Sequence, residues 1–257
     1  MSLAMPSQYS TIKADIEFHG DHHTELRGWL CRPEGVKTPA PAIVMTHGWS
    51  CLKEFYLDKY AELFAQHGFF VLVYDQRNFG ESEGEPRQEI DPWQQIRDYR
   101  DAITFLQTQG SVDPRRIGIW GTSYSGGHVL VVSAIDKRVK CVVSQVPTIS
   151  GWKGALRRTP PGEWAALRER FHQDRMQRFL GKAPQIASVL PDSTQESPAS
   201  HASEDARAFF TGQSAAPEER WRFEKWRNEI TLRSVELYAE YEPGQYITRI
   251  APTHDSS

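Results

Sequence analysis

The sequence is poor in the features that mark secreted, membrane-spanning and nucleic-acid-binding proteins. Three cysteines in 257 residues give no even disulfide framework and suit a reducing compartment. A formal net charge of −3 removes the usual electrostatic reason to bind nucleic acid. No apolar run approaches the ~20 residues that cross a bilayer, and the N-terminus has no signal-peptide pattern. We therefore expect a cytoplasmic protein that acts on neither membranes nor nucleic acid.

The first 150 residues alternate apolar runs with segments of helical spacing. Residues 42–46 and 69–74 are continuous apolar runs, which are typical of parallel strands covered on both faces. Residues 57–66 and 91–109 carry apolar side chains at helical spacing, and residues 138–145 supply a further strand. This alternation predicts an α/β fold built on a doubly wound, mostly parallel sheet.

The most informative segment is Gly121-Thr-Ser-Tyr-Ser-Gly-Gly127, which directly follows the apolar run 117–120. Small residues after a strand predict a sharp turn into a helix, with Ser123 exposed at its apex. Ser123 is therefore the candidate nucleophile. Ser125 stands where the G-x-S-x-G pattern has its second glycine, so a turn centred on Ser125 is an alternative. A helix N-terminus that binds an anion, or that binds nothing, is another.

A second motif, His47-Gly48-Trp49, follows the strand at residues 42–46. Backbone N–H groups just after such a strand can hold the negative oxygen of a tetrahedral intermediate, together with the N–H of the residue after the nucleophile. We place the Trp49 and Tyr124 amides in these roles. His47 is interpreted as a brace of this loop, and Cys51 as a packed thiol.

These motifs together resemble the α/β-hydrolase superfamily, in particular its dienelactone-hydrolase-like and Xaa-Pro-dipeptidyl-peptidase-like members. The resemblance covers about residues 9–150 and rests on His47-Gly48-Trp49, Asp75-x-Arg77-Asn78-Phe79-Gly80-x-Ser82-x-Gly84 and Gly121-x-Ser123-Tyr124. It implies a serine hydrolase that acts on a small-molecule, ester-like acyl substrate through Ser123, with Trp49 and Tyr124 as oxyanion donors and no cofactor. Asp75 and Arg77 precede the serine and are interpreted as loop organisers. Relatives include esterases, peptidases, dehalogenases and polyketide-tailoring acyltransferases, so the resemblance leaves the substrate open.

The rest of a catalytic triad does not follow in the expected order. Such enzymes place an acid and then a histidine after later strands. Residues 246–253 look like the approach to the acid-bearing strand, and His254 and Asp255 are the remaining candidates. His254 would lie at the entry end of that strand, whereas Ser123 lies beyond the exit end of its own strand. A strand of about five residues would therefore separate the two residues by about 16 Å. We therefore expect a C-terminally incomplete chain that lacks its last strands, very weak turnover, and an exposed sheet edge that invites a homodimer.

The other histidines have structural explanations. His128 lies on the helix that begins at Ser123 and should project away from the site, while His172 and His201 should be solvated. A cluster at residues 19–23 lies in the turn of a hairpin and lacks a matching cysteine or carboxylate framework. We expect no metal site.

The middle of the chain changes character and predicts a helical cap. Residues 150–240 are rich in Arg, Glu and Trp, with the clearest helices at 164–180 and 218–231 and a solvated charged face at 168–178. We divide the chain into a core at 1–149, a cap at 150–240 and a return to the core at 241–257. Two alternatives remain open: a non-catalytic ligand-binding pseudo-hydrolase, and an acyltransferase of polyketide or secondary metabolism.

Overall fold

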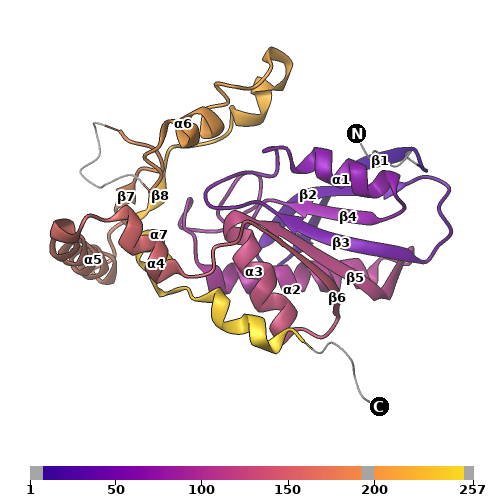
Figure 1. Cartoon of the computed structure of the whole chain (residues 1–257), viewed down its shortest axis with the longest axis horizontal. Helices are drawn as coiled ribbons and strands as arrows, with labels where there is room; N and C mark the ends of the chain where they lie inside the picture. The colour runs from indigo at the N-terminus through magenta and orange to yellow at the C-terminus, as the bar shows by residue number, and fades with distance from the viewer. Residues whose placement is uncertain (1–7, 193–199, 252–257) are drawn as a thin grey trace.

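A computed structural model describes residues 8–192 and 200–251 of the chain (Figure 1). Its main sheet has six strands in the order β1-β2-β4-β3-β5-β6; β2 pairs antiparallel with β1 and β4, and the other neighbouring pairs are parallel. This confirms the predicted mostly parallel α/β sheet. The strands are β1 (Thr11–His19), β2 (Glu25–Pro33), β3 (Ala40–Thr46), β4 (Phe70–Tyr74), β5 (Val112–Thr122) and β6 (Val139–Gln145).

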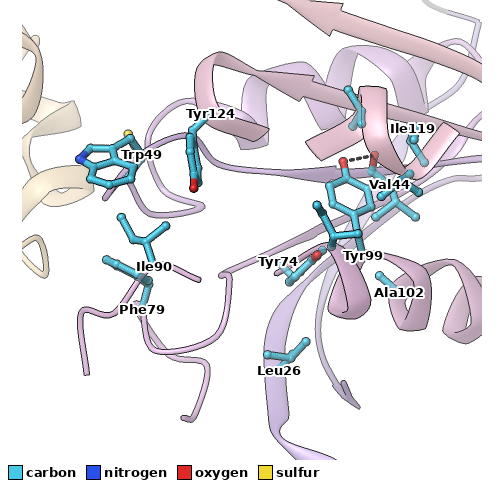
Figure 2. Packing of buried hydrophobic residues seen from close by; sticks show 14 of the residues in the cluster. Leu26, Val44, Trp49, Tyr74, Phe79, Ile90, Tyr99, Ala102, Ile119 and Tyr124 are labelled. Carbon is cyan, nitrogen blue, oxygen red and sulfur yellow. Dashed lines mark hydrogen bonds between the residues drawn. The ribbon is translucent and has the colours of Figure 1, made fainter. Parts of the chain in front are cut away.

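Helices cover both faces of this sheet. Helix α1 (Leu57–Gln66) places Leu57, Ala61 and Ala65 against one face. Helices α2 (Pro92–Thr108) and α3 (Ser123–Ile135) cover the other. Buried Tyr99 anchors α2 to the sheet. Its hydroxyl lies 2.7 Å from the Trp120 carbonyl oxygen and 3.2 Å from that of Val44 (Figure 2). The two predicted helices of the core thus form within one or two residues of their expected bounds.

A buried cation joins the loops that follow β3 and β4. The Lys53 ammonium, 1% exposed, lies 2.7 Å from Asp75, 2.8 Å from Glu81 and 3.1 Å from Glu54. Glu81 also accepts a hydrogen bond from Lys225, which is distant in the sequence. The three carboxylates form a group of the kind that holds a metal ion, but Lys53 already supplies the positive charge at its centre.

Residues 150–192 and 200–240 lie together beyond one end of the sheet (Figure 1). Their regular elements are α4 (Gly151–Arg158), η2 (Pro161–Glu163), α5 (Trp164–Phe179), β7 (Ile186–Ala187), α6 (Glu204–Phe210), η3 (Pro217–Phe223), β8 (Ile230–Thr231) and α7 (Leu232–Glu240). Strands β7 and β8 form a small antiparallel pair. The following 3-10 helix, η4 (Pro243–Arg249), returns to pack on α3. A further 3-10 turn, η1 (Asp21–His23), joins β1 to β2.

The predicted helix at residues 218–231 is wrong. The segment forms the short 3-10 helix η3, a turn and strand β8 instead. Phe223 packs on Phe55 of the core with ring centroids 4.8 Å apart, and the Trp226 indole donates to the Ser50 carbonyl. These contacts with the core take precedence over the local helical pattern.

Strand β6 forms one edge of the sheet, and part of its neighbouring face is open. Val143 is 47% exposed, and the Cys141 side chain is exposed as well. Both line an apolar hollow beside α1 that also contains Ile43, Phe64 and Trp120. Within the described residues, no helix is long and apolar enough to cross a membrane.

Candidate functional site

Ser123 occupies the sharp turn between β5 and α3. Its backbone has φ of 56°, in the left-handed region that L-residues rarely adopt, and its side chain is exposed while both neighbours in the turn are less so. Gly121 makes this path possible, because a Cβ at that position would lie 2.3 Å from the Ser125 carbonyl oxygen. The structure therefore presents Ser123 as the sequence motif predicts.

Ser125 has a different position. Its side chain is fully buried, and its hydroxyl lies 2.8 Å from the Thr46 carbonyl and 3.0 Å from that of Thr122. It also accepts a hydrogen bond from the Thr122 amide. The hydroxyl thus ties the end of β3 to the turn and is unavailable to a substrate, which excludes the alternative centred on Ser125.

The loop after β3 lies directly against the serine. A Cβ on Gly48 would lie 3.2 Å from the Ser123 Cβ and 3.6 Å from its Oγ. The Trp49 ring packs edge-on against Tyr124 with centroids 5.0 Å apart (Figure 2). Tyr124 is in the first turn of α3, where backbone N–H groups have no partner within the helix. The two amides expected to hold an oxyanion therefore belong to segments that meet at Ser123.

His47 braces this loop. Its Nε2 accepts from the Gln76 amide at 3.0 Å, and its Nδ1 donates to the Gly48 carbonyl at 3.0 Å. Burial lowers the pKa of the imidazole, which is consistent with the neutral tautomer these two bonds require. Both ring nitrogens are engaged, so His47 is not free to act as a base.

Ser123 opens into a cavity of about 340 Å³ between the loops after β3 and β5 and residues 201–210. Aromatic side chains of the core and of α6 form much of its wall, and His201 and Asp205 contribute polar groups. The lining residues are His47, Gly48, Trp49, Cys51, Phe55, Leu57, Thr122, Ser123, His201, Asp205, Ala206, Phe209 and Phe210.

His201 is not solvated, contrary to the prediction from the sequence. It is partly buried, it packs edge-on against Phe210, and its Nδ1 lies 3.1 Å from the Ser200 Oγ. Burial and the nearby positive charge of Arg158 lower its pKa to about 4, so the imidazole is neutral at pH 7. No local signal reveals this placement, because contacts with residues distant in the sequence bring His201 into the wall of the Ser123 cavity.

The other described histidines are absent from the wall of the Ser123 cavity. His128 is buried, with its ring nitrogens 2.9 Å from the Tyr241 hydroxyl and from the Gln95 side-chain oxygen, and burial lowers its pKa to about 3. His172 is exposed on α5, as expected. Among the described histidines none forms a hydrogen bond with Ser123, and those at 19, 22 and 23 join no metal-ligand group. The candidates His254 and Asp255 lie outside the described residues.

Cys51 is a packed thiol despite its place in the cavity wall. It is 8% exposed, and burial raises its pKa to about 12. The thiolate, which is the reactive form, is therefore scarce at neutral pH.

Comparisons with known proteins give one family match and several similar proteins. Residues 21–229 match the family model described as X-Pro dipeptidyl-peptidase (S15 family). The thiohydrolase aneE of Aspergillus aculeatus is 45% identical over 136 residues, which are 53% of this chain and 42% of that protein. The polyketide transferase ATR5 of Stachybotrys chlorohalonatus is 30% identical over 244 residues, which are 94% of this chain and 76% of that protein.

A solved structure, the α/β hydrolase GrgF from Penicillium sp. sh18, superposes with a TM-score of 0.75 at 26% identity. The superposition covers 94% of this chain and 78% of GrgF. The chain spans about half the length of several of the curated relatives that it matches.

Proposed function

Because the chain belongs to the X-Pro dipeptidyl-peptidase (S15) family of α/β hydrolases, we propose that it is a serine-dependent acyl-transfer enzyme whose substrate is an acyl thioester. One observation carries the proposal: Ser123 stands exposed at a strained turn and faces a cavity of mostly apolar walls. We choose a thioester as the substrate class because the relatives include a thiohydrolase and polyketide transferases. An apolar wall suits the acyl portion of such a substrate.

The chemistry has two half-reactions. The Ser123 Oγ bonds to the thioester carbonyl carbon and gives its proton to a base, and collapse of the tetrahedral intermediate breaks the C–S bond. The leaving thiolate takes up the proton. Water or an acceptor hydroxyl then bonds to the acyl carbon, and Ser123 leaves as the free hydroxyl.

The oxyanion of each intermediate would be held by the backbone N–H groups of Trp49 and Tyr124. Preorganised donors of this kind typically contribute about 10²–10³-fold each to the rate. Gly48 supports this assignment, because its lack of a side chain lets the Trp49 amide approach the serine.

Turnover by this chain is proposed to be slow. Among the described residues, no histidine is hydrogen-bonded to the Ser123 hydroxyl, and serine proteases that lose triad members retain only about 10³–10⁴-fold catalysis over water. His201 lines the same cavity and is neutral at pH 7, so among the described residues it is the base that we propose.

Two related proposals concern the role of residues 150–240 and the location of the protein in the cell. Residues 150–240 are proposed to be a cap that closes the cavity and selects the acyl group, which the presence of α6 in the cavity wall supports. A cytoplasmic location is proposed as well, supported by Cys31, Cys51 and Cys141, which are all free thiols.

The test is Ser123→Ala, with Ser133→Ala as a matched control. Ser133 lies on the same helix, and its hydroxyl contacts only the Leu130 carbonyl among the described residues. Thiol release from S-butanoyl-N-acetylcysteamine and labelling by a fluorophosphonate should be lost in Ser123→Ala and kept in Ser133→Ala. Products formed only with an added acceptor alcohol would indicate acyl transfer rather than hydrolysis.

A folded chain that shows no Ser123-dependent signal would overturn the enzymatic proposal. Thermal protection by the intact thioester, without turnover, would then favour the ligand-binding pseudo-hydrolase. If the signal is present, His201→Ala and His254→Ala identify the source of the base.

A further inference from the structure

A second cavity lies inside the cap, beside the one that contains Ser123. It is mainly apolar, with Arg158, Thr159 and Ser200 as its polar groups. Its walls are formed by Trp49, Ala155, Arg158, Thr159, Trp164, Leu167, Phe171, Ser200, Val235, Tyr238 and Ala239. The proposed reaction gives this space no role.

Trp49 is the residue common to the described walls of both cavities. Its indole N–H donates to the Ser200 Oγ at 3.2 Å. The next residue, His201, faces the cavity of Ser123, so residues 200 and 201 present their side chains to opposite compartments. The Trp49 side chain and this segment therefore form the wall between them.

The wall is firmly anchored. Trp49 is 4% exposed and packs edge-on against Tyr238 at 5.1 Å as well as against Tyr124. The amides of Ser200 and His201 donate to the carbonyls of Ser188 and Val189, at 3.2 and 2.8 Å. Figure 2 shows the indole beside Tyr124, with its nitrogen directed toward the ribbon of the cap.

We propose that the Trp49 side chain is a specificity-determining partition: it sets the longest acyl chain that fits at Ser123 by closing off the cap cavity. The inference rests on the proposed acyl-thioester function of the site. An acyl chain bonded at Ser123 starts beside Gly48 and Trp49, and its tail meets the indole before it can reach Leu167 or Ala239. Without the indole, the two apolar spaces become one.

Burial of a methylene is worth about 0.8 kcal/mol, which corresponds to about fourfold in affinity for each carbon that finds apolar surface. In the presence of Trp49, affinity should therefore rise with chain length and then level off where the tail reaches the partition. In Trp49→Ala, the space of the indole and the cap cavity of about 40 Å³ join the Ser123 cavity, so the rise should continue at about fourfold per methylene for a few further carbons.

The experiment measures binding, so that it needs no catalytic base. S-acyl-N-acetylcysteamine thioesters with four to twelve acyl carbons are titrated calorimetrically into Ser123→Ala, with and without Trp49→Ala. Trp49→Phe is the second variant: it keeps an aromatic contact with Tyr238 but is smaller and has no N–H for Ser200, so the limit should shift in the same direction by less. It carries the test if Trp49→Ala does not fold.

Ala239→Phe provides the control for where the tail goes. Ala239 lines the cap cavity and is absent from the described wall of the Ser123 cavity. Filling that space should leave the length profile unchanged while Trp49 is present and should remove the gain in the Trp49 variants.

The outcomes separate the inference from the function on which it rests. If no thioester binds to any folded variant, the acyl-thioester function itself fails. If thioesters bind but the Trp49 variants keep the parent's length limit, the partition is wrong. A gain that survives Ala239→Phe would also overturn it, because the tail would then lie elsewhere.

Discussion

Replacing Lys53 by methionine should strongly destabilise the protein. Methionine keeps most of the side-chain volume and removes only the charge, which leaves Asp75 and Glu54 buried without their shared cation. Breaking a buried ion pair by removing one partner costs about 3–5 kcal/mol. For a protein of this size, such a loss lowers the melting temperature by roughly 6–20 °C.

The effect should depend on pH in a defined direction. Burial disfavours the charged lysine, but Asp75 and Glu81 outweigh burial and hold the pKa of Lys53 above its ordinary value, so the ammonium persists throughout the neutral range. Burial and then Asp75 already raise the pKa of Glu54. Without Lys53 this pKa rises further, so the extra destabilisation is present at neutral pH and is relieved as falling pH protonates the carboxyl.

Urea unfolding followed by circular dichroism at pH 5 and pH 7.5 measures both effects. Lys59→Met is the matched control, because Lys59 pairs with Glu219 at the surface, where an ion pair contributes only about 0–1 kcal/mol. A loss in Lys53→Met no larger than that in Lys59→Met, or one that grows as the pH falls, would refute the reasoning.

Three further predictions concern the turn, the core and the edge of the sheet. Gly121→Ala should abolish fluorophosphonate labelling of the chain and lower its melting temperature, because the new Cβ would collide with the Ser125 carbonyl. Gly110→Ala is the control: a Cβ there meets nothing within 4 Å, so neither labelling nor melting temperature should change. The unfolding free energy should fall as the pH decreases from about 6.5 toward 3, because burial depresses the pKa of His128 to about 3 and only the unfolded chain binds the proton in this range. In His128→Gln the unfolding free energy should depend less steeply on pH, and an unaltered dependence would contradict this. The homodimer expected through the β6 edge should weaken in Val143→Lys, as measured by sedimentation velocity over a range of concentrations, and a monomeric parent protein would rule it out.

Local residues determine much of the core, and for this reason the sequence predicts it well. The helix at residues 57–66 has an apolar face and a clear stop, and the structure has it at those bounds. Asp91 caps α2 by accepting from the Trp93 and Gln94 amides, so the beginning of that helix is also encoded locally. The turn at Ser123 depends on the small size of Gly121, which is visible in the sequence itself.

The described parts of residues 150–240 are predicted less well, because contacts with distant residues determine their local structure. Trp226 and Phe223 pack on the loop after β3, and this packing replaces the helix that the spacing of residues 218–231 favoured. His201 reaches the cavity only because β7 and the residues after it hold its segment in place. Neither its partial burial nor its neutral charge could be read from the polar residues that surround it in the chain.

The buried Lys53 ammonium also affects how the segment that carries Lys225 is held against the loops after β3 and β4. A metal ion among three carboxylates would exchange with the surroundings and could be removed by a chelator or by dilution. The Lys53 ammonium is covalently part of the chain, so in the folded protein it is not lost from Asp75 and Glu81 into solution. Since Glu81 also pairs with Lys225, groups of the chain itself link residues 200–240 to the loops after β3 and β4, and this link needs no bound metal ion.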